Sequence, residues 1–323
     1  MGEAVRDVQH RLVALGLGSG VGADEPGSYG DGTEAAVRSF QERRGLHADG
    51  VCGDHTWAAL VEAGYRLGDR LLFLATPLQR GDDVAELQRR LGSLGFDAGR
   101  IDGIFGDRTN RALLDFQRNG GLVTDATCGP STLAALARLG SASSTSSPHS
   151  VAAVWERERH RRRPQTLDGR TVAVGETGGL DAVVRAVAAA LSACGGRSVL
   201  LQHPDPRAHA AEANALEVDC YVGLALRDGE ATGCSTSYYR SPDGWESPEG
   251  RRLADLVQGA VVPVLGATDA GVRGMAVPVL RETRMPAVVT ELGAATVVVE
   301  RSADLAAALT GALRRWVAPA VEV

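Results

Sequence analysis

The sequence contains no lysine, so all 34 basic residues among its 323 are arginine. Together with the abundance of Ala, Gly and Val, this absence indicates the codon usage of a GC-rich genome rather than a function. Hydrophobic residues make up 44% of the chain, which is enough to build packed cores and excludes a disordered protein. The formal net charge of −6 gives no field that would attract nucleic acid, and we expect no nucleic-acid partner.

Cysteine pairs, long apolar runs and an export signal are missing as well. The cysteines are widely spaced without a CxxC pair, which predicts buried free thiols rather than disulfides or a zinc knuckle. No run reaches the roughly 18 apolar residues of a transmembrane helix. The start, MGEAVRDVQHRLVALGLG, mixes charged and apolar residues and has no signal-peptide pattern. We therefore expect a cytoplasmic protein, unless an upstream start encodes an export segment.

An internal repeat is the strongest signal in the first half of the chain. Val8-Gln9-His10-Arg11-Leu12 matches Leu87-Gln88-Arg89-Arg90-Leu91, and Phe40-Gln41 and Cys52-Gly53 match Phe116-Gln117 and Cys128-Gly129. Each copy opens with apolar residues at helical spacing and continues through a glycine-rich turn into two further helical stretches. The sequence predicts two all-α modules of three helices, residues 1–66 and residues 67–140.

The amino-acid sequences of these copies resemble those of a known family. LQRRLGSLGF, IDGIFGDRTNRALLDFQRNGGL and CGPSTLAAL, all in the second copy, are similar to the three-helix peptidoglycan-binding domain found in cell-wall hydrolases. The resemblance covers roughly residues 4–64 and 82–139. It implies that the modules bind peptidoglycan or its precursors.

Residues 141–165 differ in composition from both halves. SASSTSSPHS is polar and of low complexity, and ERERHRRRP is a charged run that ends at Pro164. We interpret this segment as an interdomain linker, and the arginine run as a solvated linker or helix end. An acidic partner for the arginines is the alternative.

The pattern changes from residue 166 onward to alternating strands and helices. Short apolar runs at 171–174, 198–201, 220–226 and 287–290 alternate with helical stretches at 180–194, 207–216, 247–265 and 302–317. Such alternation predicts an α/β domain with a mostly parallel sheet over residues 166–323.

This second half is similar to the zinc-dependent N-acetylmuramoyl-L-alanine amidases (zinc amidase type 3), which cleave between N-acetylmuramic acid and L-alanine. The likeness rests on Ala213-Asn214, on Gly233-Cys-Ser-Thr-Ser-Tyr-Tyr, and on the run from Val279 to Gly293. It implies a zinc ion held by a His after the first strand, a Glu opening the next helix and a His closing the third strand. It also implies a second Glu as general base near the end of a later strand.

The ligand positions of that family are altered here. The first turn reads Val174-Gly-Glu-Thr-Gly-Gly179, which places either Thr177 at the first His or Glu176 at the helix-opening Glu. Ala225 stands where the second His belongs, and only Glu291 fits its role, that of the general base. Because both imidazoles are replaced, we expect no metal, no cofactor and a vestigial Glu291.

Substitute ligands are conceivable at His203, His209, Cys220 and Cys234, but their spacing matches no ligand pattern. For the two histidines, a surface or capping role is the simpler interpretation. A zinc-dependent amidase with an unusual site stays open as an alternative.

Two modules, no export signal and lost zinc ligands together resemble an actinobacterial group of cytosolic, amidase-like regulators. Tyr65–Arg70, Asp82–Gln88 and Leu280–Pro286 carry this likeness. It implies a pseudoenzyme that regulates peptidoglycan precursor synthesis through the enolpyruvyl transferase of the first committed step and through the lipid II flippase. The regulators' phosphorylated C-terminal tail has no counterpart after Trp316, so we do not expect that control. An exported, wall-anchored binding protein is a further alternative.

Overall fold

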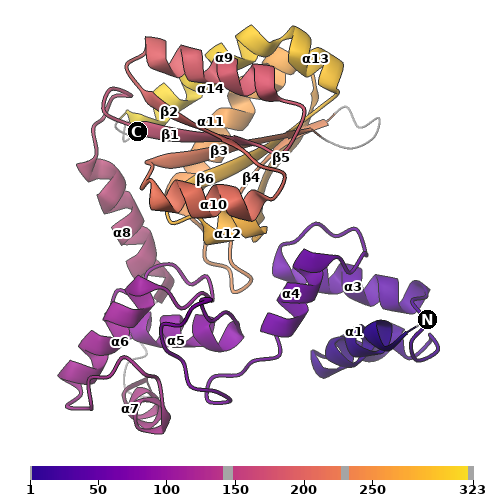
Figure 1. Cartoon of the computed structure of the whole chain (residues 1–323), viewed down its shortest axis with the longest axis vertical. Helices are drawn as coiled ribbons and strands as arrows, with labels where there is room; N and C mark the ends of the chain where they lie inside the picture. Colours follow the sequence, from indigo (N-terminus) through magenta and orange to yellow (C-terminus); the bar gives the residue numbers. More distant parts are fainter. Residues whose placement is uncertain (1, 141–147, 227–232, 319–323) are drawn as a thin grey trace. The chain divides into compact units, whose positions relative to one another are not determined.

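The computed structural model describes the whole chain except residues 1, 141–147, 227–232 and 319–323 (Figure 1). The chain divides into two compact units, an N-terminal unit of Met1–Trp155 and a C-terminal unit of Glu156–Val323. No helix in the described ranges is long and apolar enough to cross a membrane. The fold class predicted from the sequence, helical modules followed by an α/β domain, is confirmed.

The N-terminal unit is all-helical and holds two modules, each with its own core. The first module consists of α1 (Glu3–Ala14), α2 (Gly18–Val21), α3 (Asp31–Arg44) and α4 (Asp54–Glu62). The second consists of α5 (Asp82–Ser93), α6 (Asp107–Asn119) and α7 (Pro130–Gly140). The single-turn α2 lies in the longer loop of the first module and is the one addition to the predicted three helices. Leu12, Val37 and Phe40 centre the first core, and Leu87, Leu113 and Phe116 the second.

The segment that joins the modules belongs to the second of them. Leu72 is fully buried in the second core, and its backbone pairs with that of Cys128. Arg70 forms a two-point ion pair with the buried carboxylate of Asp83, and its guanidinium lies 3.8 Å from the centre of the Tyr65 ring. Leu72 and the partly buried Leu67 therefore extend the second core, whereas Leu71, Phe73 and Leu74 are exposed.

Both modules are built from a smaller unit that occurs twice in each. Every unit has a buried glutamine near the middle or end of one helix and a threonine in the first turn of the next. The pairs are Gln9–Thr33, Gln41–Thr56, Gln88–Thr109 and Gln117–Thr132, joined by hydrogen bonds of 3.0–3.2 Å from the amide Nε2 to the hydroxyl. In every pair the glutamine Oε1 accepts the backbone N–H of a left-handed loop residue, namely Gly27, Gly50, Gly103 or Ala126. The loop polar groups are thereby satisfied inside the fold.

Part of the expected linker is helical. α8 (Pro148–Arg162) runs through the charged stretch, and Glu156 and His160 on it are buried in the C-terminal unit. Residues 156–162 are therefore the end of a helix, on which Arg157, Arg161 and Arg162 are exposed whereas Glu156 and His160 are not. The reason is that Glu156 and His160 lie one helical turn apart and bury a common face. The Ser-rich part, residues 141–147, lies outside the described residues.

The C-terminal unit is built on one six-stranded sheet with the order β2-β1-β3-β6-β4-β5. Its strands are β1 (Thr171–Glu176), β2 (Arg197–Gln202), β3 (Cys220–Leu226), β4 (Gly233–Tyr239), β5 (Thr268–Met275) and β6 (Ala287–Leu292). All neighbouring pairs are parallel except β4 and β6. The sheet is thus mostly parallel, as predicted.

Helices cover both faces of this sheet (Figure 1). They are α9 (Asp181–Ala193), α10 (Pro206–Ala215), α11 (Pro248–Leu265), α12 (Pro278–Glu282), α13 (Ala295–Glu300) and α14 (Ser302–Val317). α9, α11 and α14 share one apolar core with alternate residues of β1, β3 and β6, such as Val174, Val222 and Val288. α10 and α12 lie on the opposite face (Figure 1). Because side chains alternate along a strand, neighbouring residues at the strand ends face different layers.

Candidate functional site

The candidate site lies where β1, β3 and β6 end, at the carboxyl edge of the parallel part of the sheet. Ala225 on β3 is directly beside Glu291 on β6, so the two side chains share a face. Glu176, the last residue of β1, is beside Leu224, whose side chain lies in the core with α9 and α11. Glu176 and Glu291 therefore point to opposite faces of the sheet.

Glu176 serves the turn that follows its own strand. Its Oε2 accepts the backbone N–H of Gly178 at 2.7 Å and that of Leu180 at 3.3 Å, and its Oε1 accepts a longer bond from Gln202. Leu180 is the N-cap residue of α9 and has no side chain that could cap the helix. The buried carboxylate of Glu176 thus takes over the capping of α9, where negative charge is favourable.

Thr177, the alternative to Glu176 in the first turn, and Ala225 are the other two positions at which the resemblance places zinc ligands. Thr177 is exposed in the turn between β1 and α9, and Ala225 is half-buried near the end of β3. Neither a methyl group nor a single hydroxyl supplies the imidazole nitrogens from which such a zinc site gains its affinity. The donors at this edge of the sheet do not fit a catalytic zinc ion.

Glu291 is held by its neighbour across the antiparallel pair. Ser235 on β4 is buried and lies directly opposite Glu291, and its hydroxyl donates to Glu291 Oε2 at 3.2 Å. The carboxylate at the family's general-base position is therefore fixed in place. The sequence did not reveal the role of Ser235, because the register of β4 against β6 follows from no local pattern.

The histidines considered as substitute ligands are used within the fold. His209 on α10 is buried, and its Nε2 accepts the backbone N–H of His203 at 3.1 Å. Its Nδ1 then carries the hydrogen and donates to the Tyr221 hydroxyl at 3.0 Å. Burial lowers the pKa of His209, so the ring is neutral at pH 7. His203 is exposed and its Nδ1 accepts the backbone N–H of Asp205, which is the capping role expected of it.

The Tyr221–His209 pair covers the glycines of β1 and β3 on the face of the sheet that carries Ala225. A Cβ added at Gly175 on β1 would lie 2.7 Å from His209 Nδ1 and closer still to the Tyr221 hydroxyl. Gly223 on β3 is similarly covered by the Tyr221 ring. Glycine is required at both positions for this side-chain pair to lie flat on the sheet.

The two cysteines are no more available than the histidines. Cys220 and Cys234 are buried in the core shared with α9 and α11, and burial raises the pKa of the Cys220 thiol far above its usual value. Within the described part of the chain, no group of three or more His, Cys, Asp or Glu side chains is arranged to hold a metal ion. The fold places Thr177, Ala225 and Glu291 at the carboxyl edge of the sheet. It does not add the histidines or cysteines considered above as substitute ligands.

Comparison with known proteins now gives the family. The sequence pattern of the peptidoglycan binding domain matches residues 1–60 and 80–136, and that of the N-acetylmuramoyl-L-alanine amidases (Amidase_3) matches residues 170–305. The chain is 37% identical over 289 residues to the N-acetylmuramoyl-L-alanine amidase CwlM of Mycobacterium tuberculosis, across 80% of this chain and 70% of that protein. The chain is a member of the N-acetylmuramoyl-L-alanine amidase family.

Other amidases are similar over less than half of the chain. The N-acetylmuramoyl-L-alanine amidase CwlL of Bacillus licheniformis is 33% identical over 159 residues, which cover 43% of this chain and 44% of that protein. Among solved structures, the catalytic domain of the amidase CwlV from Bacillus (Paenibacillus) polymyxa var. colistinus matches with a TM-score of 0.39 and 19% identity. It covers 45% of this chain and 97% of that domain. Because the amidase pattern matches residues 170–305, the C-terminal unit is called the amidase-like domain below.

Proposed function

We propose that this amidase-like protein is a non-catalytic regulator or scaffold of peptidoglycan precursor synthesis. The observation that carries the proposal is the set of hydrogen bonds that Glu176 accepts. Its carboxylate is engaged by the amides of Gly178 and Leu180 and faces away from Glu291, so it is committed to capping α9. With Thr177 and Ala225 at the former imidazole positions, no set of ligands supports an activated water for Glu291 to deprotonate.

The peptidoglycan-binding modules supply the ligand in this proposal. Both keep complete cores and the same buried glutamine–threonine pairs, so both are intact folds. They would bind peptidoglycan or its precursors, and the amidase-like domain would contact wall-synthesis proteins. The resemblance to cytosolic regulators suggests an enolpyruvyl transferase and a lipid II flippase as those proteins, and the cytoplasm as the location.

A zinc-dependent amidase is the second candidate function. It is favoured by the position of Glu291, which Ser235 orients at the family's general-base site, and by the activity in the names of the relatives. A third candidate is an exported, wall-anchored binding protein. Only the presence of the two peptidoglycan-binding modules supports it.

Genetic complementation separates regulation from catalysis. In a host depleted of this protein, the Glu291→Gln variant should restore normal growth and wall synthesis, because a scaffold needs no general base. Arg161→Glu together with Arg162→Glu, on the exposed side of α8, should impair the same function through altered contact surfaces. Failure of Glu291→Gln to complement, with normal protein levels, would contradict the proposal.

A further inference from the structure

α8 connects the two units, and its second half is built into the amidase-like domain. The boundary between the compact units falls inside this helix, between Trp155 and Glu156. Glu156 and His160 are buried one helical turn apart, whereas Arg157, Arg161 and Arg162 are exposed. The helix therefore offers one polar face to the domain and an arginine-rich face to solvent.

Glu156 caps a helix that lies far away in the sequence. Its Oε1 accepts the Ser247 hydroxyl and the backbone N–H of Glu249, the latter at 3.2 Å. Ser247 is the N-cap of α11, an 18-residue helix, and accepts the backbone N–H of Gly250 at 3.0 Å. The Glu249 N–H has no acceptor within its own helix, because the first N–H groups of a helix are unpaired. An ionised carboxylate at this end of α11 accepts a hydrogen bond from the Glu249 N–H and also interacts favourably with the helix dipole.

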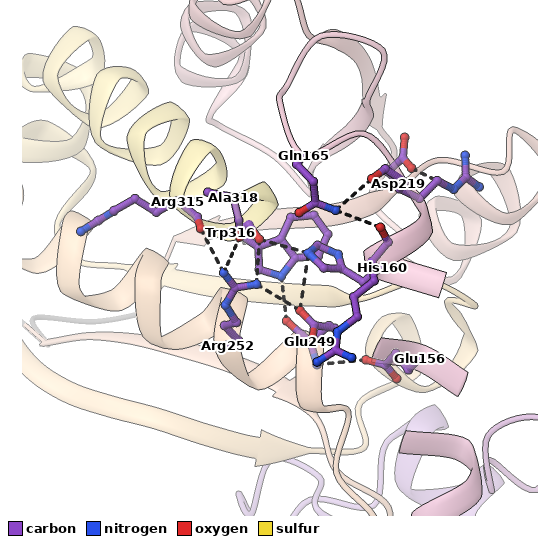
Figure 2. A network of polar contacts seen from close by, with 12 residues as sticks. Glu156, His160, Gln165, Asp219, Glu249, Arg252, Arg315, Trp316 and Ala318 are labelled. Atoms are coloured by element: carbon purple, nitrogen blue, oxygen red, sulfur yellow. Dashed lines mark hydrogen bonds and ion pairs between the residues drawn. The ribbon is translucent and has the colours of Figure 1, made fainter. Parts of the chain in front are cut away.

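His160 holds the other end of the same contact. Its Nε2 donates to the Trp316 carbonyl at 3.1 Å, and the two rings lie with centroids 4.4 Å apart. The Trp316 indole N–H in turn donates to the Glu249 carbonyl at 3.1 Å, so α8, α11 and α14 meet at one point (Figure 2). Burial and the nearby Arg170 lower the pKa of His160 to about 4, which keeps the ring neutral at pH 7.

Arg170, which directly precedes β1, anchors the chain that leaves α8. It is almost fully buried, and its guanidinium donates to the carbonyls of Pro164 at 2.7 Å and His160 at 3.4 Å and pairs with Asp219. The contact combines these polar groups with the packing of the His160 ring against Trp316, a residue of the domain's apolar core. Burial raises the pKa of the Glu249 carboxyl, with a smaller contribution from the charge of Glu156, and Arg252 pairs with Glu249 and opposes the shift.

We propose that residues 156–163 of α8 form a releasable latch on the amidase-like domain, closed by Glu156 at the N-terminus of α11 and by His160 at Trp316. When the latch is closed, the helix that leads to the peptidoglycan-binding modules is fixed to the domain. When it opens, the N-terminus of α11 and Trp316 are uncovered. Opening breaks these contacts and leaves the sheet intact, so it needs less free energy than global unfolding.

Amide hydrogen exchange on the full chain, followed residue by residue by NMR, tests the latch. The Glu249 amide reports directly, because its acceptor belongs to α8. In Glu156→Ala, exchange at Glu249 and at residues 157–162 should accelerate together by roughly tenfold, the effect of losing a helix cap. Amides of β1 and β3 should be unchanged, which shows that the variant is folded. Glu158→Ala is the matched control, because Glu158 pairs with Arg162 on the outer side of α8.

Two results would overturn the proposal. One is unchanged exchange at Glu249 in Glu156→Ala; the other is exchange of residues 157–162 in the unaltered chain at the rate of an unstructured peptide. Limited trypsin digestion gives an independent readout, because the arginines between 157 and 163 are cut only when the latch is open. Cleavage there should be slow in the unaltered chain and in Glu158→Ala, and several-fold faster in Glu156→Ala. Equal rates in all three chains would reject the latch.

Discussion

Buried glutamines hold the loops of the peptidoglycan-binding modules in shape. Gln88 donates to Asp102, to the Ile104 carbonyl and to Thr109, and accepts the N–H groups of Asp102 and Gly103. The sequence showed the repeat of whole modules but not this smaller repeat within each. In the first unit of the first module, Pro26 stands at the position that corresponds to Asp102, and Asp24 accepts the Thr33 hydroxyl instead. The smaller repeat is therefore not apparent in the sequence.

We predict that Gln88→Leu destabilises the second module by about 2–3 kcal/mol, although leucine has a similar size. The loop keeps its N–H groups and the Asp102 carboxylate but loses their buried partner, and unsatisfied buried polar groups are costly. Urea unfolding of the unaltered and variant chains measures the difference. Arg111→Leu, on the exposed side of α6, is the control and should shift stability by less than about 0.5 kcal/mol. A comparable effect of the two substitutions would show that the amide network contributes little.

A strained loop residue provides a second prediction at this scale. Ala126 has a φ of 57°, whereas the equivalent positions in the other three units are glycines, with φ between 70° and 86°. A left-handed conformation costs a residue with a Cβ about 1–2 kcal/mol. Ala126→Gly should therefore leave stability unchanged or raise it by up to about 1 kcal/mol, after the entropy of glycine is deducted. Gly103→Ala should lower stability in the same thermal unfolding assay, and the opposite order would contradict this view of the loop.

At the scale of elements, the sequence predicted β1, β2, β3 and β6 and missed β4 and β5. The apolar runs that become β1, β2, β3 and β6 were apparent, because strands covered by helices on both faces read as continuous apolar stretches. β5 has the sequence TDAGVRGM and lies at the edge of the sheet, where one neighbour defines it. Its assignment follows from pairing with β4 and not from any local pattern.

The helix α8 was missed for a related reason. Its charged residues indicate a solvated segment, and only the fold shows that Glu156 and His160 meet α11 and α14. We predict that a fragment of residues 166–323 is less stable than one of residues 148–323 by about 2–4 kcal/mol. The shorter fragment removes the acceptor of the buried Glu249 N–H, and Arg170 loses the carbonyls of Pro164 and His160 and keeps its pairing with Asp219. Equal denaturant midpoints would show that α8 adds nothing to the domain.

For the whole molecule, the sequence identified the candidate site but not its present use. Thr177, Ala225 and Glu291 were located by resemblance, and the register of β3 and β6 places Ala225 and Glu291 side by side. That Glu176 caps α9, and that Tyr221 and His209 cover the glycines of β1 and β3, depends on side-chain packing across elements. The account is thus of an amidase fold whose ligand positions serve the fold itself.

The most direct test of this account is zinc content measured together with peptidoglycan hydrolysis on the purified full chain. Metal analysis after dialysis against zinc should find far less than one zinc ion per chain, because both imidazole positions are lost. Purified peptidoglycan should release no muropeptide fragments, with or without Glu291→Gln, while a zinc amidase of the family releases them under the same conditions. One tightly held zinc per chain, together with hydrolysis that disappears in Glu291→Gln, would contradict the account.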